Sequence, residues 1–272
     1  MSLRTLSVVL ALCLALSGCV GNRLDELNDS LNSLSNPPQP EALATLAREA
    51  EAEAKKVVDP KDRAGFYRIA AVAAWQAGKA GNSLVFSVSD AGIATCEGLP
   101  NKDQAAPRDC SLIRLAAPLA VQDDLARDLA QFQGKLKQLE DAHQQRCGAL
   151  AGDERARCLA ARAKLPAADL SPVQSLFGGF ETQFEKVSTI RSRLTNLDVD
   201  DTFRRKTDRQ RVIIFCNAMK AWSLSADVEG ASVSSFTAMA GRKKAMEDRL
   251  NSDSLTSDCR DLATAQTAKW DE

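Results

Sequence analysis

Residues 118–145 read PLAVQDDLARDLAQFQGKLKQLEDAHQQ, the most regular stretch of a chain of 272 residues. Its large apolar side chains recur at spacings of 4, 3, 4 and 3, and they are Leu125, Leu129, Phe132, Leu136 and Leu139. This heptad pattern is typical of a helix with a single apolar face. The stretch therefore predicts a long helix over residues 118–145, and continuing its spacing puts His143 and Cys147 on or near the same face.

Helical periodicity continues on both sides of this stretch, and no segment alternates as a half-buried strand does. The other predicted helices cover residues 41–57, 60–78, 83–96, 153–164, 172–196, 201–226, 230–250 and 256–268. The predicted core side chains of two of them are Leu176, Phe177, Phe180, Phe184, Val187 and Leu194, then Val212, Ile213, Phe215, Cys216, Met219 and Trp222. The apolar run at 212–215 could form a short strand, but its flanks are helical. We expect an all-α fold.

The composition supports helix and excludes several classes of protein. The chain has 43 alanines and only 5% aromatic residues, a balance that favours helix over sheet. With 35 basic and 36 acidic side chains the net charge is −1, which argues against a nucleic-acid partner. A hydrophobic content of 44% is too high for a wholly disordered chain. Because there is a single histidine, we expect no metal site, and no cofactor motif is present.

The N-terminus has the features of a secretory signal. Arg4 is followed by an apolar run from Leu6 to Leu16, and its 11 residues are too few to span a bilayer. The next residues complete the sequence Leu16-Ser17-Gly18-Cys19, which resembles the lipobox of bacterial lipoproteins. The resemblance implies that residues 1–18 are a signal peptide. It also implies that Cys19 carries palmitate-type acyl chains and becomes the mature N-terminus.

The resemblance also implies a location. Several acyl chains give stable anchoring, because each buried CH₂ contributes about 0.8 kcal/mol. Val20 follows the modified cysteine, whereas an aspartate there would resemble an inner-membrane retention signal. We therefore expect an outer-membrane lipid anchor with the protein body facing the periplasm of a bacterial cell envelope.

Residues 19–40 are predicted to be a lipidated tether that ends in a proline-rich spacer. Leucines recur along it at spacings of 3, 4 and 3, and they are Leu24, Leu27, Leu31 and Leu34. This stripe could be a short coiled-coil seam, but three turns are too few to be stable alone. We favour a helix that lies loosely near the lipid surface. A periplasmic helical domain is then predicted over residues 41–272, with 41–165 and 166–272 as candidate subdomains.

The eight cysteines divide by compartment. Cys13 leaves with the signal peptide and Cys19 carries the lipid, so an even six remain in an oxidising environment. We favour pairs of sequence neighbours, because the first two pairs flank loops rich in turn residues. The predicted bridges are Cys96–Cys110, Cys147–Cys158 and Cys216–Cys259. Free thiols or a redox-active pair are the alternative.

The six bridged cysteines indicate a disulfide-stapled helical bundle. Residues 64–92, with small residues around Phe, Tyr and Trp, are similar in texture to tetratricopeptide-type helical pairs. No second copy follows at the period of such repeats. This resemblance keeps a short α-solenoid open as the alternative architecture.

Four clusters of polar or small residues are candidate sites. His143 is the only imidazole, and without a nucleophile motif near it we expect a structural role and no catalytic residue. Three carboxylates at Asp198, Asp200 and Asp201 lack the calcium-loop spacing and are expected to cap a helix. Basic runs at 204–211 and 242–244 are expected to be solvated helix faces, with an acidic partner or anionic lipid as the alternative.

The fourth cluster is Gly178-Gly179, which lacks the context of a phosphate-binding loop. We expect a kink or a close helix crossing at this pair. Exposed Phe177 and Phe180 around it could instead form a docking patch.

These features favour a non-enzymatic lipoprotein that binds another envelope protein. The alternative is a hydrolase that acts on peptidoglycan or another glycan through paired carboxylates. Lysozyme-like lytic enzymes resemble one another in a Glu-Ser pair, and no Glu-Ser dipeptide occurs in this chain. The sequence therefore predicts a scaffold, not an enzyme.

Overall fold

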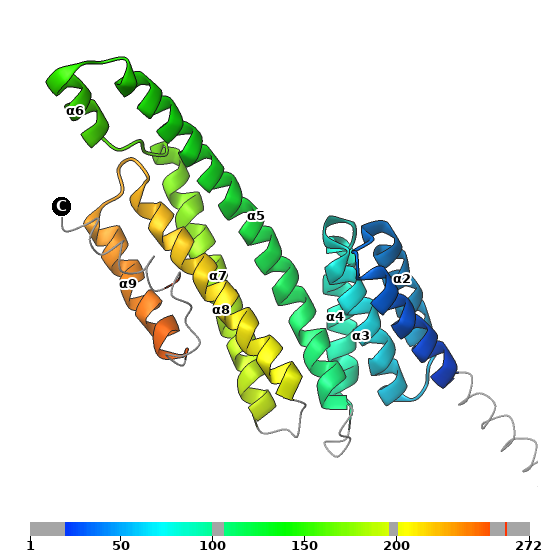
Figure 1. Ribbon diagram of the computed structural model, residues 1–272. Coiled ribbons are helices and arrows are strands. Elements are labelled where there is room, and N and C mark those ends of the chain that lie inside the picture. Colours follow the sequence, from blue (N-terminus) through cyan, green and yellow to red (C-terminus); the bar gives the residue numbers. More distant parts are fainter. Residues whose placement is uncertain (1–19, 100–105, 196–200, 251–258, 260–272) are drawn as a thin grey trace, which may run out of the picture. The chain divides into compact units, whose positions relative to one another are not determined.

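The computed structural model describes residues 20–99, 106–195, 201–250 and Cys259. Within these ranges the fold is all-α, as predicted, with two isolated bridges and no strand (Figure 1). The named helices are α2 (Pro40–Ala54), α3 (Pro60–Gln76), α4 (Asn82–Glu97), α5 (Ala106–Gly148), α6 (Gly152–Ala160), α7 (Leu170–Thr195), α8 (Asp201–Ala226) and α9 (Val233–Asp248). Residues 20–34 form a further helix. The helix predicted over 256–268 lies outside the described residues apart from Cys259.

The chain divides into two compact units, and the boundary falls inside α5 between Ala120 and Val121. The predicted boundary after residue 165 differs from this one. The reason is the length of α5, which has 43 residues and begins 12 positions before Pro118, the expected first residue. A proline inside a helix removes one backbone donor, and its ring crowds the carbonyl group four residues earlier. Buried neighbours such as Leu115 and Leu119 hold α5 together around it.

The core of unit 1 is built largely from alanine. Helix α3 packs between α2 and α4, and ten alanines of α2, α3 and the turn after α3 are buried: Ala44, Ala47, Ala50, Ala54, Ala64, Ala70, Ala71, Ala73, Ala74 and Ala77. Because alanine adds only a methyl group, the helix backbones approach closely, and Phe66 and Ile69 fill the remaining space. The same closeness explains Gly92, where a β-carbon would lie 2.8 Å from the Ile113 side chain.

The expected loose tether is instead part of this core. Leu27 and Leu31 are only 2% and 5% exposed, and they pack in the same cluster as α2 and α3. Leu24 lies close to Gly65: a β-carbon added at Gly65 would be 3.0 Å from Leu24 Cδ2. The helix at residues 20–34 does not lie loosely, because its leucine stripe packs against the core cluster that contains α2 and α3.

Polar contacts hold the same helix in place. Arg23 forms ion pairs with Glu26 and with Glu49 of α2. Arg68 of α3 donates from Nη2 to the Asn28 side-chain oxygen at 3.1 Å. The link between the packed helix and α2 is therefore only residues 35–39, and the helical body includes residues 20–34 as well as the predicted domain from residue 41.

Unit 2 has a core rich in large side chains. Phe177, Phe180 and Phe184 of α7 are fully buried, as predicted. The Phe184 ring lies 6.5 Å from the Phe215 ring of α8, centroid to centroid. Ile213 was predicted to be in the core but is 37% exposed, and its neighbour Ile214 is buried instead. The error arises because an unbroken apolar run does not show which of its residues faces inward.

The burial of Phe177 and Phe180 contradicts the docking-patch alternative for Gly178-Gly179. The close-crossing alternative is confirmed, since a β-carbon at Gly179 would lie 2.8 Å from Leu125 Cδ1 of α5. The heptad seam of α5 therefore meets α7 at this glycine.

All three predicted disulfides are present, with Cα–Cα distances of 5.3 to 5.8 Å. Cys96–Cys110 joins the end of α4 to the start of α5. Cys147–Cys158 joins the end of α5 to α6, and Cys216–Cys259 joins α8 to the C-terminal part of the chain. The fold is a disulfide-stapled helical bundle.

Candidate functional site

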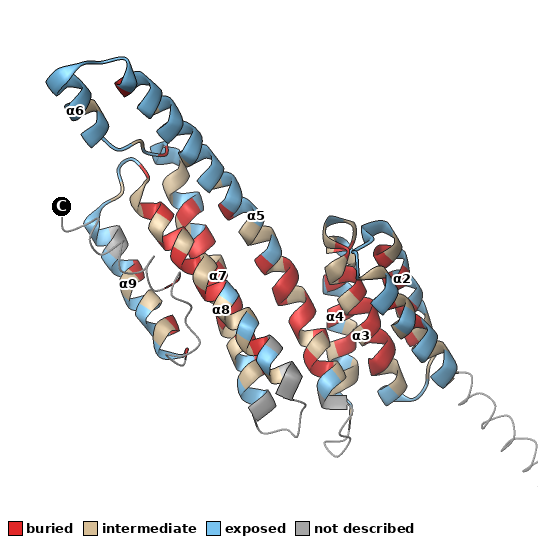
Figure 2. Ribbon diagram, in the orientation of Figure 1, coloured by how far each residue is buried: buried red, intermediate tan, exposed pale blue. Residues whose placement is uncertain are grey.

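The apolar seam of α5 loses its cover toward the C-terminal end of the helix. Leu129 is 2% exposed, Leu136 is half-buried and Leu139 is 38% exposed. Figure 2 shows this change along α5, with buried residues giving way to exposed ones toward α6. Two features occupy this part of unit 2: a groove against α8, and a hairpin formed by residues 143–161, named the distal hairpin below.

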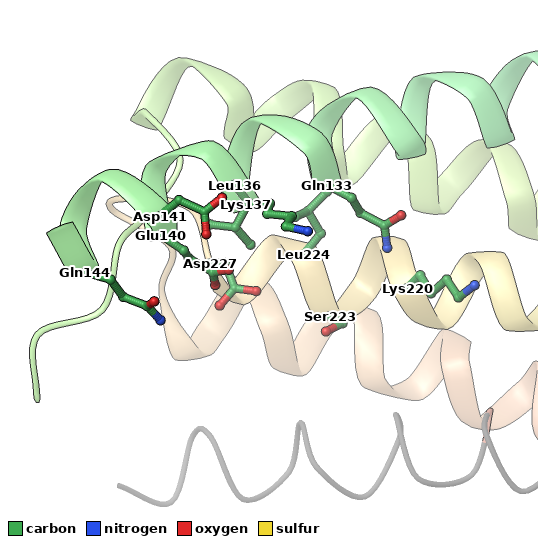
Figure 3. Close-up of a pocket in the computed structure, with 10 residues that line it drawn as sticks. All are labelled: Gln133, Leu136, Lys137, Glu140, Asp141, Gln144, Lys220, Ser223, Leu224 and Asp227. Carbon is green, nitrogen blue, oxygen red and sulfur yellow. The ribbon is translucent and has the colours of Figure 1, made fainter. Parts of the chain in front are cut away.

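The groove lies between α5 and α8 and encloses about 320 Å³. Leu136 and Leu224 supply its apolar surface, and they lie next to each other between the two helices in Figure 3. The polar lining residues are Gln133, Lys137, Glu140, Asp141, Gln144, Lys220, Ser223 and Asp227. The groove is thus a short apolar strip with charged edges.

Charge is unevenly distributed along the groove. Figure 3 shows Lys220 near Gln133 at one end, and Asp227 near Glu140 at the other. Asp141 adds a third carboxylate to the lining residues. The arrangement suits an apolar segment that carries basic groups at one end.

The groove was not predicted from the sequence, although its polar lining residues show a regular spacing. Lys220 and Ser223 of α8 and Asp227, directly after it, recur at helical spacing. The polar lining residues of α5 do the same opposite them. Each set reads as an ordinary solvated face. Only the packing of α5 beside α8 shows that the two faces meet.

The distal hairpin brings the lone imidazole to a disulfide. His143 Nε2 lies 2.7 Å from the backbone oxygen of Cys158 and 3.5 Å from Cys147 Sγ. Cys147 is fully buried, whereas His143 and Cys158 are half-buried. The predicted shared face of His143 and Cys147 and the predicted Cys147–Cys158 bridge are both confirmed. Only the contact of His143 with the Cys158 backbone was not predicted.

Little apolar burial holds the hairpin together. Among residues 143–161, Cys147 is the only buried one, and α6 itself contains no buried residue. Leu150 and Leu159 are 39% and 50% exposed. The disulfide and the hydrogen bond of His143 are therefore the main contacts between α6 and the end of α5.

The acidic cluster and the first basic run are described only in part. Asp198 and Asp200 lie outside the described residues, and Asp201 is the first residue of α8. In the first basic run, Arg211 Nε donates to Ser188 at 3.1 Å, and Arg205 and Arg209 are exposed.

The second basic run is partly solvated, as expected: Arg242 and Lys244 are exposed, and Lys243 is half-buried. Arg242 pairs with Glu181, which raises the pKa of Arg242, and its guanidinium lies 5.1 Å from the Phe177 ring centroid. Lys243 Nζ lies 4.9 Å from the Trp222 ring centroid. Both cations therefore also pack over aromatic side chains of the unit 2 core.

Unit 1 contains one well-shielded ion pair. Arg68 Nε lies 2.9 Å from Asp109 Oδ1. Burial raises the pKa of Asp109 despite the opposing effect of Arg68, and burial likewise lowers the pKa of Arg68 despite Asp109. Loss of water outweighs the mutual attraction at both groups, and the pair links α3 to α5.

The predicted lipidation residue Cys19 lies outside the described residues. Among the helices that the structure describes, none combines the length and apolarity needed to cross a bilayer. Comparisons with protein-family models, with curated proteins and with solved structures give no match to this chain.

Proposed function

We propose that this chain is an outer-membrane lipoprotein, acylated at Cys19, whose periplasmic helical body binds another envelope protein without catalysis. The observation that carries the proposal is the sequence Leu16-Ser17-Gly18-Cys19 after an apolar run of signal-peptide length. Three disulfides in the body support it, because such bonds persist in an oxidising compartment.

The packed helix at residues 20–34 gives this anchor a mechanical consequence. Val20 already contacts the core cluster of unit 1, one residue after the proposed acylation site. A flexible spacer would let the body sample many distances from the bilayer. With no such spacer, the lipid holds unit 1 directly at the membrane surface and raises the effective concentration of the binding module there.

The groove between α5 and α8 is the proposed binding face. An amphipathic helix docks by laying its apolar side chains into such a strip, and Leu136 and Leu224 offer the matching surface. Glu140, Asp141 and Asp227 favour basic side chains at one end of that helix, and they also favour its positive N-terminal end. The proposed partner is therefore a protein segment that is helical, amphipathic and basic at its N-terminus.

The anchor is tested by metabolic labelling with an alkyne-bearing palmitate analogue. We expect labelled wild-type protein in the outer-membrane fraction, and an unlabelled Cys19→Ala variant that is released from it or misrouted. Wild-type protein that is unlabelled and recovered without detergent in the soluble fraction would sink the lipoprotein assignment.

The binding face is tested by site-specific photo-cross-linking in cells. A photoreactive side chain at Gln133 or Gln144, both exposed in the groove, should give one dominant adduct. The matched control at Lys186, exposed on α7, should not. Once the adduct is identified by mass spectrometry, Leu136→Glu should weaken binding of the purified partner at least about tenfold, since it places a charge in an apolar strip. An unchanged affinity would move the interface elsewhere.

The hydrolase alternative has one observation in its favour: the groove collects three carboxylates, Glu140, Asp141 and Asp227. Two-carboxylate hydrolysis needs such a set. The hydrolase alternative would be established if the wild-type protein clears purified murein and the Glu140→Gln or Asp227→Asn variant does not. We expect no clearing by any of the three proteins.

A further inference from the structure

We propose that Cys147, Cys158 and His143 form a binding site for a thiophilic cation such as Zn²⁺ once the disulfide between the two cysteines is reduced. The proposal concerns the distal hairpin alone and does not depend on the proposed function. In this second state a bound metal ion, in place of the disulfide, holds α6 against α5.

The donor atoms already have the arrangement of a metal site. His143 and Cys147 lie one helical turn apart on α5, and Cys158 comes from α6. One donor atom from each of the three residues lies within 4.8 Å of the other two. An i, i+4 pair on one helix face is a common bidentate arrangement for zinc.

One distance matches tetrahedral zinc closely. With Zn–S at about 2.3 Å and Zn–N at about 2.0–2.1 Å, tetrahedral angles put neighbouring sulfur and nitrogen ligands about 3.5 Å apart. His143 Nε2 lies 3.5 Å from Cys147 Sγ. After reduction the two sulfurs must separate, and His143 Nε2 must give up its hydrogen bond to the Cys158 backbone oxygen as the ring proton moves to Nδ1. The exposed α6 has few packing contacts to resist that movement.

Burial differs among the three donors in a way that suits capture of an ion. Cys147 is fully buried, while His143 and Cys158 are half-buried. A reductant can therefore reach the sulfur of Cys158, and an ion can enter from the same side. A fourth ligand position facing solvent would take water, since the described residues supply three donors.

The reaction balances with an external dithiol as the reductant. The dithiol gives two electrons and two protons to the Cys147–Cys158 bond and itself becomes a disulfide. The two thiols then lose their two protons as they bind Zn²⁺ as thiolates. The sum is protein disulfide plus dithiol plus Zn²⁺, giving the zinc dithiolate, the oxidised dithiol and two protons.

The other two disulfides provide an internal comparison. The chain has one histidine, and it lies at Cys147–Cys158. Cys96–Cys110 has a similar Cα–Cα distance, 5.8 Å against 5.4 Å, but no imidazole. If reduced thiols alone were sufficient, the first pair would bind the ion as well as the second.

The test uses Co²⁺ as a spectroscopic probe of the full-length mature protein, oxidised or reduced with a phosphine. We expect thiolate-to-cobalt charge-transfer bands and tetrahedral d–d bands for one ion per reduced chain, and none in the oxidised chain. Cys96→Ser/Cys110→Ser should keep the bands, and Cys147→Ser/Cys158→Ser should lose them. His143→Ala should weaken Zn²⁺ binding at least about tenfold against a chromophoric chelator, as expected for a lost ligand.

A second measurement covers the case in which full reduction unfolds the protein. With limiting dithiol and Zn²⁺ present, alkylation followed by peptide mapping should show Cys147 and Cys158 protected by the metal, and His143→Ala should remove the protection. Bands that persist in Cys147→Ser/Cys158→Ser would overturn the proposal. Zinc that leaves alkylation of Cys147 and Cys158 unchanged would also overturn it.

Discussion

The core of unit 1 and the distal hairpin hold helices together by different means. In unit 1, many small buried side chains share the contact, and Phe66 and Ile69 are almost wholly enclosed. In the hairpin, Cys147 is the one buried residue between positions 143 and 161, and a covalent bond replaces the missing apolar contact. Burial spreads stability over many residues, whereas a single bond concentrates it in a place where chemistry can change it.

The largest expected loss of stability comes from a substitution in the core of unit 1. Phe66→Ala removes a buried aromatic ring from closely packed helices and should lower the free energy of unfolding by about 3–5 kcal/mol. The matched change in the hairpin is Leu159→Ala, whose side chain is 50% exposed. It should change stability by no more than about 0.5 kcal/mol. Urea unfolding of both variants checks the contrast, and similar losses would refute it.

The second largest expected loss of stability tests whether the helix at residues 20–34 belongs to the core. Leu27→Ala should cost about 2–5 kcal/mol, because the side chain is 2% exposed. Asn32→Ala, an exposed position in the same helix, is the control and should cost almost nothing. A free tether would predict equal and negligible changes, so urea unfolding separates the two possibilities.

The third expected loss of stability is confined to the distal hairpin. Cys147→Ser/Cys158→Ser should lower the free energy of local opening of α6 by about 2–4 kcal/mol, because the bridge no longer restricts the open state. Amide hydrogen exchange should accelerate in α6 and stay unchanged in α2 and α3. Cys96→Ser/Cys110→Ser is the mirror control, with faster exchange in unit 1. Loss of protection throughout the chain in the first variant would contradict a local role.

The smallest effect concerns pH and the ion pair of unit 1. Burial raises the pKa of Asp109 above its ordinary 3.8, so the folded chain binds this proton more tightly than the unfolded chain does. The contribution of Asp109 to stability is therefore fully present below pH 3.8 and decreases as the pH rises through the folded pKa. Asp109→Asn should lack that decrease. Unfolding free energies across this pH range, wild type against variant, measure the difference in slope, and equal slopes would contradict it.

Local patterns predicted much of this molecule. The spacing from Leu125 to Leu139 indicated α5, and the even number of cysteines in neighbouring positions indicated the three bridges. The spacing also put His143 and Cys147 on one face. Such predictions succeed because helical period and loop length depend on residues that are near in sequence.

The failures share the opposite cause. The leucines of residues 20–34 were predicted to lie loosely because the residues that bury them come from other helices, α2 and α3. The choice of Ile213 over Ile214 failed because both are equally apolar. The groove between α5 and α8 was missed because each of its two walls looks like an ordinary polar helix face.

The sequence by itself determined the all-α class, the disulfide pairs and the expectation of a lipid at Cys19, since each follows from short-range spacing and composition. Only the tertiary structure decided that residues 20–34 pack into the core, which helix faces meet in the groove and that His143 contacts the Cys158 backbone. The physical reason is that burial and donor geometry are properties of surfaces brought together from distant segments. No single segment specifies its neighbours.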